Sequence, residues 1–138
     1  MFTEHEVSAK LDWKLGETVG FKVKGLQEKI GVSWIEGQFL TESLKTLNEG
    51  RTALKWSFPV AYYSDPSHNL TKIFIDNQGL LSNAVENLSE LLQIKSPEVI
   101  MKRRTEFYNK AGYVKNRTKA LLECGRDLLR KGISKARE

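Results

Sequence analysis

The stretch SPEVIMKRRTEFYNKAGYVKNRTKALLECGRDLLRK, Ser96 to Lys131, decides the fold class. Apolar side chains recur in it every seven residues, the spacing that lines up side chains on one face of a helix packed against another helix. They are Ile100, Phe107, Val114, Leu121 and Leu128. Ser96 is a favoured N-cap residue and Pro97 suits the first helical position. The stretch therefore predicts one long helix from about Pro97 to Lys131.

Two further lines of side chains flank this apolar line. The small residues Ala111, Thr118 and Gly125 would let a neighbouring helix approach closely. The other line is apolar at four positions and charged at one, and consists of Met101, Tyr108, Lys115, Leu122 and Leu129. Lys115 therefore stands at the edge of the buried stripe, where it either extends its ammonium group to water or makes a functional contact. The basic residues Arg103, Lys110 and Arg117 occupy the opposite flank.

The rest of the chain also has helical periodicity. The predicted helices cover Thr3 to Ile30, Trp34 to Ser64, Asn77 to Gln93 and Pro97 to Lys131. Pro59 interrupts the second of them and predicts a kink there. Ser64 to Asn69 has the composition of a loop, and Lys72 to Ile75 is a weak strand candidate. We therefore expect an elongated all-α bundle of about four helices, with a kinked second helix and a long last one.

The run VSWIEGQFL, Val32 to Leu40, concentrates apolar residues around one acid, and its role has two interpretations. One is a ligand-binding surface and the other is the start of a helix. Ser33 and Glu36 have the spacing of a capping box, in which each side chain bonds a backbone amide of the other's residue. This spacing gives Glu36 a structural role as a capping residue. Trp34 either packs against the first helix or contacts a ligand.

Size and charge suggest one domain with a basic C-terminal part. The chain has 138 residues, the length of one domain, which we place at residues 1–132, followed by a flexible tail at 133–138. Residues 97–138 contain 12 Lys/Arg and 5 Asp/Glu, a net charge of +7, whereas the remainder contains 10 and 12, a net charge of −2. A solvated helix face or a surface for an acidic partner would explain this asymmetry.

Neither a membrane segment nor a secretion signal is expected. Residues 1–10 are polar and acidic where a secretory signal would be apolar. With one cysteine, Cys124, and two histidines, His5 and His68, the chain cannot form a disulfide framework or a Cys/His zinc site by itself. We expect a soluble, non-secreted protein of the cytoplasm or the nucleus.

Motifs that would carry catalysis are not found in the sequence. It has no glycine-rich phosphate loop, no G-x-S-x-G, no HExxH and no CxxC pair. Cys124 lies inside a helical pattern, where a small buried hydrophobe is the simplest interpretation. We therefore predict no catalytic residue, metal site or cofactor in this chain, and a helical bundle that contacts other macromolecules.

Three runs of residues extend this interpretation. They are SWIExQFL at Ser33 to Leu40, RxALxWxFxxAYY at Arg51 to Tyr63, and NQxxLxxAxExLS at Asn77 to Ser89. Together they resemble the Ariadne domain, the C-terminal helical domain of the Ariadne class of RING-between-RING (RBR) E3 ubiquitin ligases. The resemblance covers nearly the whole chain, to about Gly132.

The resemblance implies a function within a larger ligase. In the family, a RING module recruits the ubiquitin-conjugating enzyme, and a cysteine in a zinc-bound catalytic module accepts ubiquitin as a thioester. The Ariadne domain covers this catalytic module until a modified cullin–RING complex binds. The family pattern therefore implies that this chain is an autoinhibitory and partner-sensing domain, with the catalytic cysteine and the zinc sites elsewhere in the parent protein.

The family contacts that hold the closed form can be placed residue by residue. A hydrophobe–acid pair in the first helix falls on Leu11 and Asp12, which keep that chemistry. An acid in the last helix falls on Lys115, which reverses the charge. The resemblance then implies a different contact, a weaker interface, or a displaced match in which Asn116 takes the role.

Two alternatives remain open at this point. The bundle could instead be a module that binds a peptide of a client or partner. A nonspecific nucleic-acid-binding domain that uses the basic last helix is the third possibility. For either kind of partner, Arg103, Lys110 and Arg117 would form the partner-binding basic face. Few aromatic residues accompany the basic ones, which disfavours base stacking.

Overall fold

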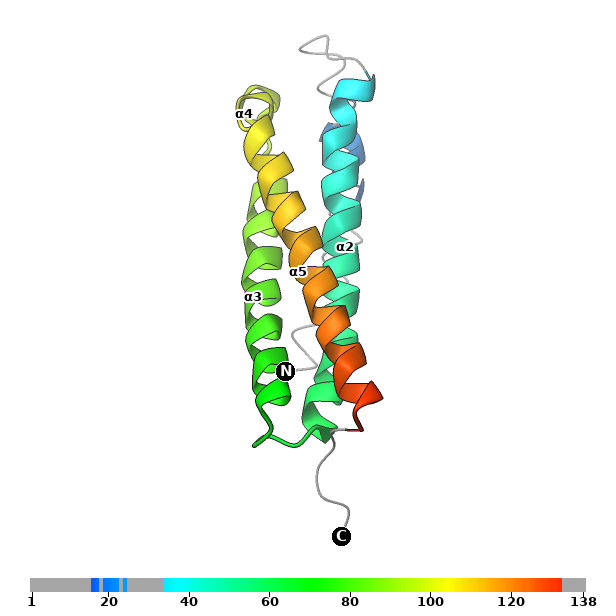
Figure 1. The fold of residues 1–138 in the computed structure, drawn as a ribbon. Helices are drawn as coiled ribbons and strands as arrows, with labels where there is room; N and C mark the ends of the chain where they lie inside the picture. The colour runs from blue at the N-terminus through cyan, green and yellow to red at the C-terminus, as the bar shows by residue number, and fades with distance from the viewer. Residues whose placement is uncertain (1–15, 18, 23, 25–33, 133–138) are drawn as a thin grey trace.

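Three long helices lie lengthwise against one another in a computed structural model of the chain (Figure 1). The structure describes residues 16–17, 19–22, 24 and 34–132, and side chains of α2 from Gly37 onward. Its helices are α2 (Trp34–Tyr63), α3 (Asn69–Leu92), α4 (Pro97–Lys102) and α5 (Arg104–Arg130). Within these residues no strand occurs, and α2, α3 and α5 each contact the other two. The prediction of an all-α bundle with a long last helix is confirmed.

The described residues of the first segment are helical and join the core. Val19 is buried among the apolar side chains of the bundle. Lys22 is buried as well, and its ammonium donates a hydrogen bond to the carbonyl oxygen of Leu92 at the end of α3. Burial lowers the pKa of Lys22, and the charge of Lys95 acts in the same direction. The remainder of the helix predicted at Thr3 to Ile30 lies outside the described residues.

α2 agrees with its predicted boundaries. It runs from Trp34 to Tyr63 as one helix that contains Pro59, as the sequence predicted. The kink near Pro59 stays a prediction.

After α2, the carboxylate of Asp65 accepts hydrogen bonds from the backbone amide of Ser67 at 3.0 Å and from its hydroxyl at 2.8 Å. This turn separates α2 from α3, so the predicted loop is confirmed.

α3 begins eight residues before its predicted start at Asn77. The ring nitrogen Nδ1 of His68 accepts a hydrogen bond from the amide of Leu70 at 3.1 Å and caps the helix. The strand prediction for Lys72 to Ile75 was wrong, because this run is helical. Phe74 is fully buried while its neighbours on both sides are exposed, a pattern that a helix produces as readily as a strand does.

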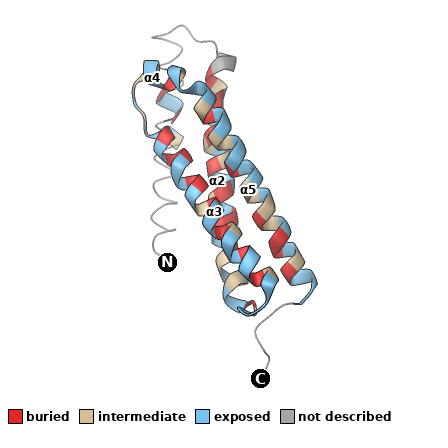
Figure 2. Ribbon diagram, turned by 60° about the vertical axis from the view of Figure 1, so that its left-hand side comes forward, coloured by how far each residue is buried: buried red, intermediate tan, exposed pale blue. Residues whose placement is uncertain are grey.

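The long last helix is interrupted near its start, contrary to the sequence prediction. α4 ends at Lys102 and α5 begins at Arg104, because Arg103 has φ −98° and ψ 14°, outside the helical range. α4 lies across the end of the bundle (Figures 1 and 2). The predicted cap is present, since the hydroxyl of Ser96 accepts from the amide of Val99 at 3.5 Å.

α5 ends where the sequence predicted. Gly132 has φ 63°, a conformation that glycine adopts without strain, and its amide donates to the carbonyl of Leu129 at 3.2 Å. The domain limits of 1–132 and the tail of 133–138 remain predictions, because the tail lies outside the described residues.

The core lies along the apolar line that recurs every seven residues, which starts at Ile100 on α4 and continues on α5. All five members of this line are at most 1% exposed, which confirms the predicted buried stripe. The largest buried side chains of the other two helices complete this core, and they are Leu40, Leu47, Leu54, Phe74, Leu81, Leu88 and Leu92. Figure 2 shows the buried residues on the sides of α2, α3 and α5 that face one another. Burial of this apolar surface holds the three helices together.

A buried polar bridge joins α2 to α3. The side-chain amide of Gln78 donates to the hydroxyl of Ser57 at 2.8 Å, and that hydroxyl donates to the carbonyl of Leu54 at 2.7 Å. Both residues are buried, so each hydrogen bond replaces one that water would otherwise make. The bridge fixes the register of α3 against the end of α2.

Candidate interaction surfaces

The structure places only part of the predicted closed-state contact. Leu11, Asp12 and the cap residue Ser33 lie outside the described residues, as does the side chain of Glu36. Lys115 is exposed on α5. The roles of all five residues remain predictions.

The predicted basic face turns toward α3. The guanidinium of Arg117 donates to the side-chain oxygen of Asn77 on α3 at 3.5 Å and is only partly exposed. Arg103 pairs with Glu106 one turn along α5. Arg103 and Lys110 also border a small pocket of about 120 Å³ that α3 closes with Asn87, Glu90 and Leu91. These three basic residues thus have contacts inside the domain, and their role in binding a partner remains a prediction.

Cys124 is a buried core residue, as the sequence indicated. It is 8% exposed, and its sulfur donates a weak hydrogen bond to the carbonyl of Leu70 at 3.9 Å. Burial raises the pKa of the thiol, opposed by a hydrogen bond from Asn77 and supported by the charge of Asp127. A buried thiol with a raised pKa is a poor nucleophile near neutral pH.

The raised thiol pKa makes stability depend on pH in the alkaline range. The unfolded thiol ionises near its ordinary value of 9.0, whereas the folded thiol stays neutral to higher pH. We therefore expect the contribution of Cys124 to be constant below that value and to be lost as the pH rises through the folded pKa. Urea unfolding at a series of pH values should show a steeper alkaline loss for the wild type than for Cys124→Ala. Other groups titrate in both proteins, so only the difference between the two curves reports on Cys124. Parallel curves would contradict the raised pKa of its thiol.

The described part of the chain contains neither a metal-binding cluster nor a membrane span. No group of three or more His, Cys, Asp or Glu side chains gathers there. None of the helices that the structure describes is long and apolar enough to cross a bilayer.

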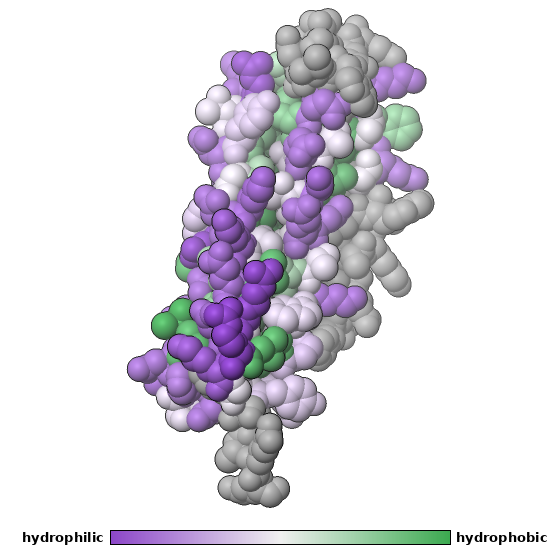
Figure 3. All heavy atoms as spheres, turned by 45° about the vertical axis from the view of Figure 1, so that its right-hand side comes forward, coloured by the Kyte–Doolittle hydropathy of each residue, from purple (hydrophilic) through white to green (hydrophobic). Residues whose placement is uncertain are grey.

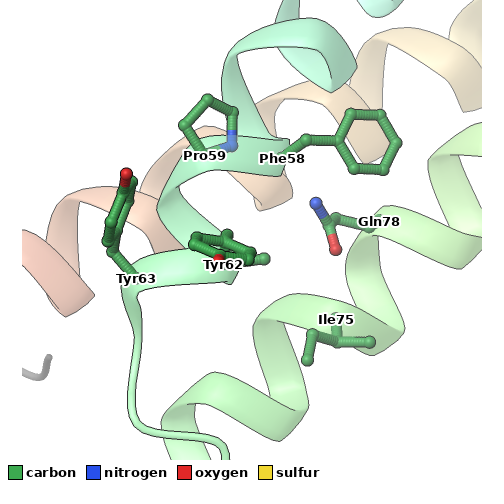
Figure 4. A pocket seen from close by; sticks show the side chains of 7 residues that line it. Phe58, Pro59, Tyr62, Tyr63, Ile75 and Gln78 are labelled. Atoms are coloured by element: carbon green, nitrogen blue, oxygen red, sulfur yellow. The ribbon is translucent and has the colours of Figure 1, made fainter. Parts of the chain in front are cut away.

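An apolar cleft opens between the end of α2 and the first half of α3 (Figure 4). Its volume is about 600 Å³, and it is lined by Phe58, Pro59, Ala61, Tyr62, Tyr63, Ile75 and Gln78. Tyr62 and Tyr63 are 66% and 67% exposed and lie edge to face, with ring centroids 5.0 Å apart. Exposed aromatic rings beside an apolar hollow are typical of surfaces that contact another molecule.

A second open surface follows the junction of α2 and α5, and we call it the α2–α5 groove. It has a volume of about 660 Å³ and is lined by Lys45, Asn48, Glu49, Thr52, Ala53, Trp56, Thr118 and Leu122. Trp56 is 41% exposed, although its ring packs closely over Gly125 of α5. The floor of the groove is therefore apolar.

Exposed basic residues run along the outer edge of this groove. Lys119 and Arg126 stand three residues before and four residues after Leu122, so they are its neighbours on the helix surface. Lys115 lies seven residues before Leu122, on the same line. We call Lys115, Lys119 and Arg126 the α5 basic ridge. Figure 3 shows strongly hydrophilic side chains running down this face, with hydrophobic ones beside them.

Sequence reasoning missed both the ridge and the cleft. The heptad spacing placed Lys115 at an edge but did not indicate that Lys119 and Arg126 continue it beside Leu122. Counting exposed charges by helical position in the last helix would have found the ridge. The cleft could not be found in this way, because it depends on where α3 begins.

The fold and these surfaces define the class of the protein, an all-α bundle with open apolar surfaces. No family model matches the chain. Over its full 138 residues it is 79% identical to E3 ubiquitin-protein ligase HEL1 of Saccharomyces cerevisiae. Identity is 37% over 92 residues, 67% of the chain, with E3 ubiquitin-protein ligase ariadne-1 of Drosophila melanogaster, and 30% over 123 residues, 88% of the chain, with E3 ubiquitin-protein ligase ARIH1 of Homo sapiens.

The chain belongs to the Ariadne-class RBR E3 ligase family, as one of its helical domains. It spans 25% of the length of HEL1, 18% of ariadne-1 and 22% of ARIH1. The resemblance identified from the three sequence runs is therefore confirmed.

Proposed function

We propose that this chain is the autoinhibitory and partner-sensing domain of an RBR E3 ubiquitin ligase. The parent protein transfers ubiquitin through a cysteine thioester, and its catalytic cysteine and zinc-bound RING modules lie outside the chain. The domain covers the catalytic module until a modified cullin–RING complex binds. The parent acts in the cytoplasm or the nucleus, together with a ubiquitin-conjugating enzyme.

One observation carries the proposal. The chain matches relatives named as E3 ubiquitin ligases along its length, yet it spans a quarter or less of each of them. Its single cysteine is buried with a raised pKa, which does not suit an acceptor of ubiquitin. Catalysis in the parent is therefore assigned to another part, and this domain to regulation and partner contact.

The closed-state contact is assigned to Leu11, Asp12 and Lys115. Leu11 would insert an apolar side chain into the catalytic module and Asp12 would accept hydrogen bonds from it. Lys115 is exposed, so its ammonium can reach a facing domain. Because the family pattern has an acid at this position, we expect the opposing surface here to offer an acceptor or an acid where relatives offer a donor.

Loss of this contact should activate the parent ligase. In the intact protein, Leu11→Ala combined with Asp12→Ala should raise autoubiquitination without an activating complex by about 5- to 150-fold, the usual range for coupling between two sites. The reason is that the closed state loses an apolar and a polar contact, while the open state loses neither. The rate of ubiquitin transfer to the ligase itself, measured on gels, is the readout.

A matched control separates activation from damage to the fold. Asp76→Ala on α3 removes an exposed acid that is not among the residues of the proposed contact, and it should leave the rate unchanged. An unchanged rate in the Leu11/Asp12 variant, with a normal response to the cullin complex, would exclude these two residues from the closed state.

A peptide-binding module is the second candidate function. It is favoured by the two open apolar surfaces, the apolar cleft and the α2–α5 groove. Such a module would bind its peptide as an isolated domain. In that case, replacing Leu11 and Asp12 would leave the basal rate of the ligase unchanged.

A further inference from the structure

We infer that the α2–α5 groove binds an acidic amphipathic helix of a partner protein, held by the α5 basic ridge. The inference deepens the second candidate function, and it concerns a surface of the isolated domain. It depends on the apolar floor of the groove, the length of the groove, and the charge along its two edges.

The floor of the groove offers an anchoring position for an apolar side chain. Trp56 and Ala53 of α2 and Leu122 and Thr118 of α5 line it. Trp56 exposes 41% of its surface, although its ring has α5 close beneath it at Gly125. An exposed tryptophan supported from below offers contact area at little cost in conformational entropy.

The length and shape of the groove suit a helix. From Lys45 to Trp56 the groove follows twelve residues of α2, a rise of about 16.5 Å at 1.5 Å per step. This length accommodates about three turns of a partner helix, whose apolar residues at positions three, four and seven apart would enter the groove.

The charges of the two edges differ, and this difference selects an acidic partner. The α5 edge carries Lys115, Lys119 and Arg126, and none of them forms an ion pair with any residue that the structure describes. The α2 edge is mixed, with Lys45 and Glu49. A partner with acidic residues along one flank would therefore orient that flank toward α5, where it would pair with cations that are otherwise exposed to water.

Other acids on this face do not cancel the ridge. Glu123 is exposed four residues after Lys119 and three before Arg126, but it forms no ion pair with either among the described residues, and Asp127 pairs with Arg130 at 3.9 Å. Each ridge cation faces solvent, so an incoming carboxylate would not have to displace an acid of the domain.

The test uses the full chain and a synthetic peptide of about 14 residues, four helical turns long. The peptide carries leucines at helical spacing on one side and glutamates on one flank. Binding is measured by fluorescence anisotropy, with the indole resonance of Trp56 followed by NMR. We expect saturable binding that weakens with salt, and a shift of the Trp56 resonance. A peptide with glutamine in place of each glutamate should bind at least about tenfold more weakly.

The decisive variant is Lys119→Glu combined with Arg126→Glu. It should weaken binding at least about tenfold, because two attractive pairs become repulsive. Lys72→Glu with Lys102→Glu is the matched control, since it changes the net charge equally at exposed positions outside the groove, and it should leave the affinity within about twofold. Lys115 is left unchanged, so the result is independent of the proposed closed-state contact and of the ligase assay.

Several results would overturn the inference. Absence of binding at about millimolar peptide, equal affinity for the glutamine peptide, or equal affinity of the two double variants would each do so. Tighter binding of polyuridylate or of phosphatidylserine vesicles would assign the ridge to a different partner. A dimer in light scattering that the Lys119/Arg126 variant dissolves would assign the groove to a second copy of the chain.

Discussion

Replacing Phe107 by alanine is expected to lower the free energy of unfolding by about 3–5 kcal/mol. The Phe107 side chain is fully buried and is the first member of the apolar line on α5. Its ring lies edge to face with Phe39 of α2, with centroids 5.5 Å apart. Alanine would remove this contact and leave a cavity that three helices cannot close, because each is held along its whole length by other contacts.

The neighbouring tyrosine supplies the control. Tyr108 is 58% exposed, although its ring also approaches Phe39, with centroids 6.0 Å apart and an interplanar angle of 40°. Tyr108→Ala should cost less than about 1 kcal/mol, because most of its surface is already in water. Urea unfolding, monitored by circular dichroism, measures the loss of unfolding free energy in both variants. Similar losses for the two variants would show that the apolar line of α5 is not the main contact of the bundle. Since a domain of this size is stable by about 5–15 kcal/mol, Phe107→Ala should remove a large share of the total.

Replacing Gly50 by leucine is expected to destabilise the fold by about 3 kcal/mol or more. Gly50 lies where the three long helices meet. A Cβ atom built on it would stand 3.0 Å from Cγ2 of Val85 on α3 and 3.1 Å from Cγ1 of Val114 on α5. Valine is stiff at χ1, so neither neighbour can turn away, and the helices would have to separate.

Gly79 is the matched control for this prediction. It is also inside a helix, but a Cβ added there would meet nothing within 4 Å. Gly79→Leu should therefore stabilise the domain by about 0.5–1 kcal/mol, since leucine favours the helix and no neighbour is displaced. Unfolding experiments on both variants should give effects of opposite sign. The same sign for both would mean that the close approach at Gly50 does not limit packing.

Local patterns in the sequence predicted most of the fold. The serine and proline at the start of α4, the loop after α2 and the buried line of α5 follow from capping chemistry and from a repeat of apolar residues, and all were confirmed. Such features depend on residues within one or two turns of each other. The sequence therefore determines the cap, the loop and the position of the apolar line before any helix packs.

Other features did not follow from local patterns. The run Lys72 to Ile75 fits a strand or a helix by periodicity, and the cap by His68 and the burial of Phe74 decide for the helix. The break at Arg103 leaves the apolar spacing intact, so the pattern could not reveal it. These choices depend on contacts and backbone angles that the seven-residue repeat does not encode.

The sequence predicted only part of the candidate interaction surfaces, as it predicted only part of the fold. The sequence identified the family through its three runs and placed Lys115 at an edge of the last helix. It assigned partner binding to Arg103, Lys110 and Arg117, but these turn toward α3, whereas Lys119 and Arg126 stand free beside Leu122. Periodicity states which residues share a face of a helix, but not which neighbour covers that face.

By itself, then, the sequence determined the helical class, the family, the apolar line of the last part of the chain and the cap at Ser96. Only the tertiary structure decided where the chain leaves surface open: the apolar cleft beside Tyr62, the α2–α5 groove and the basic ridge along it. The physical reason is that burial is a property of pairs of elements. Each helix carries its own pattern of apolar and charged residues, but water is excluded from a side chain only by the helix that lies opposite it.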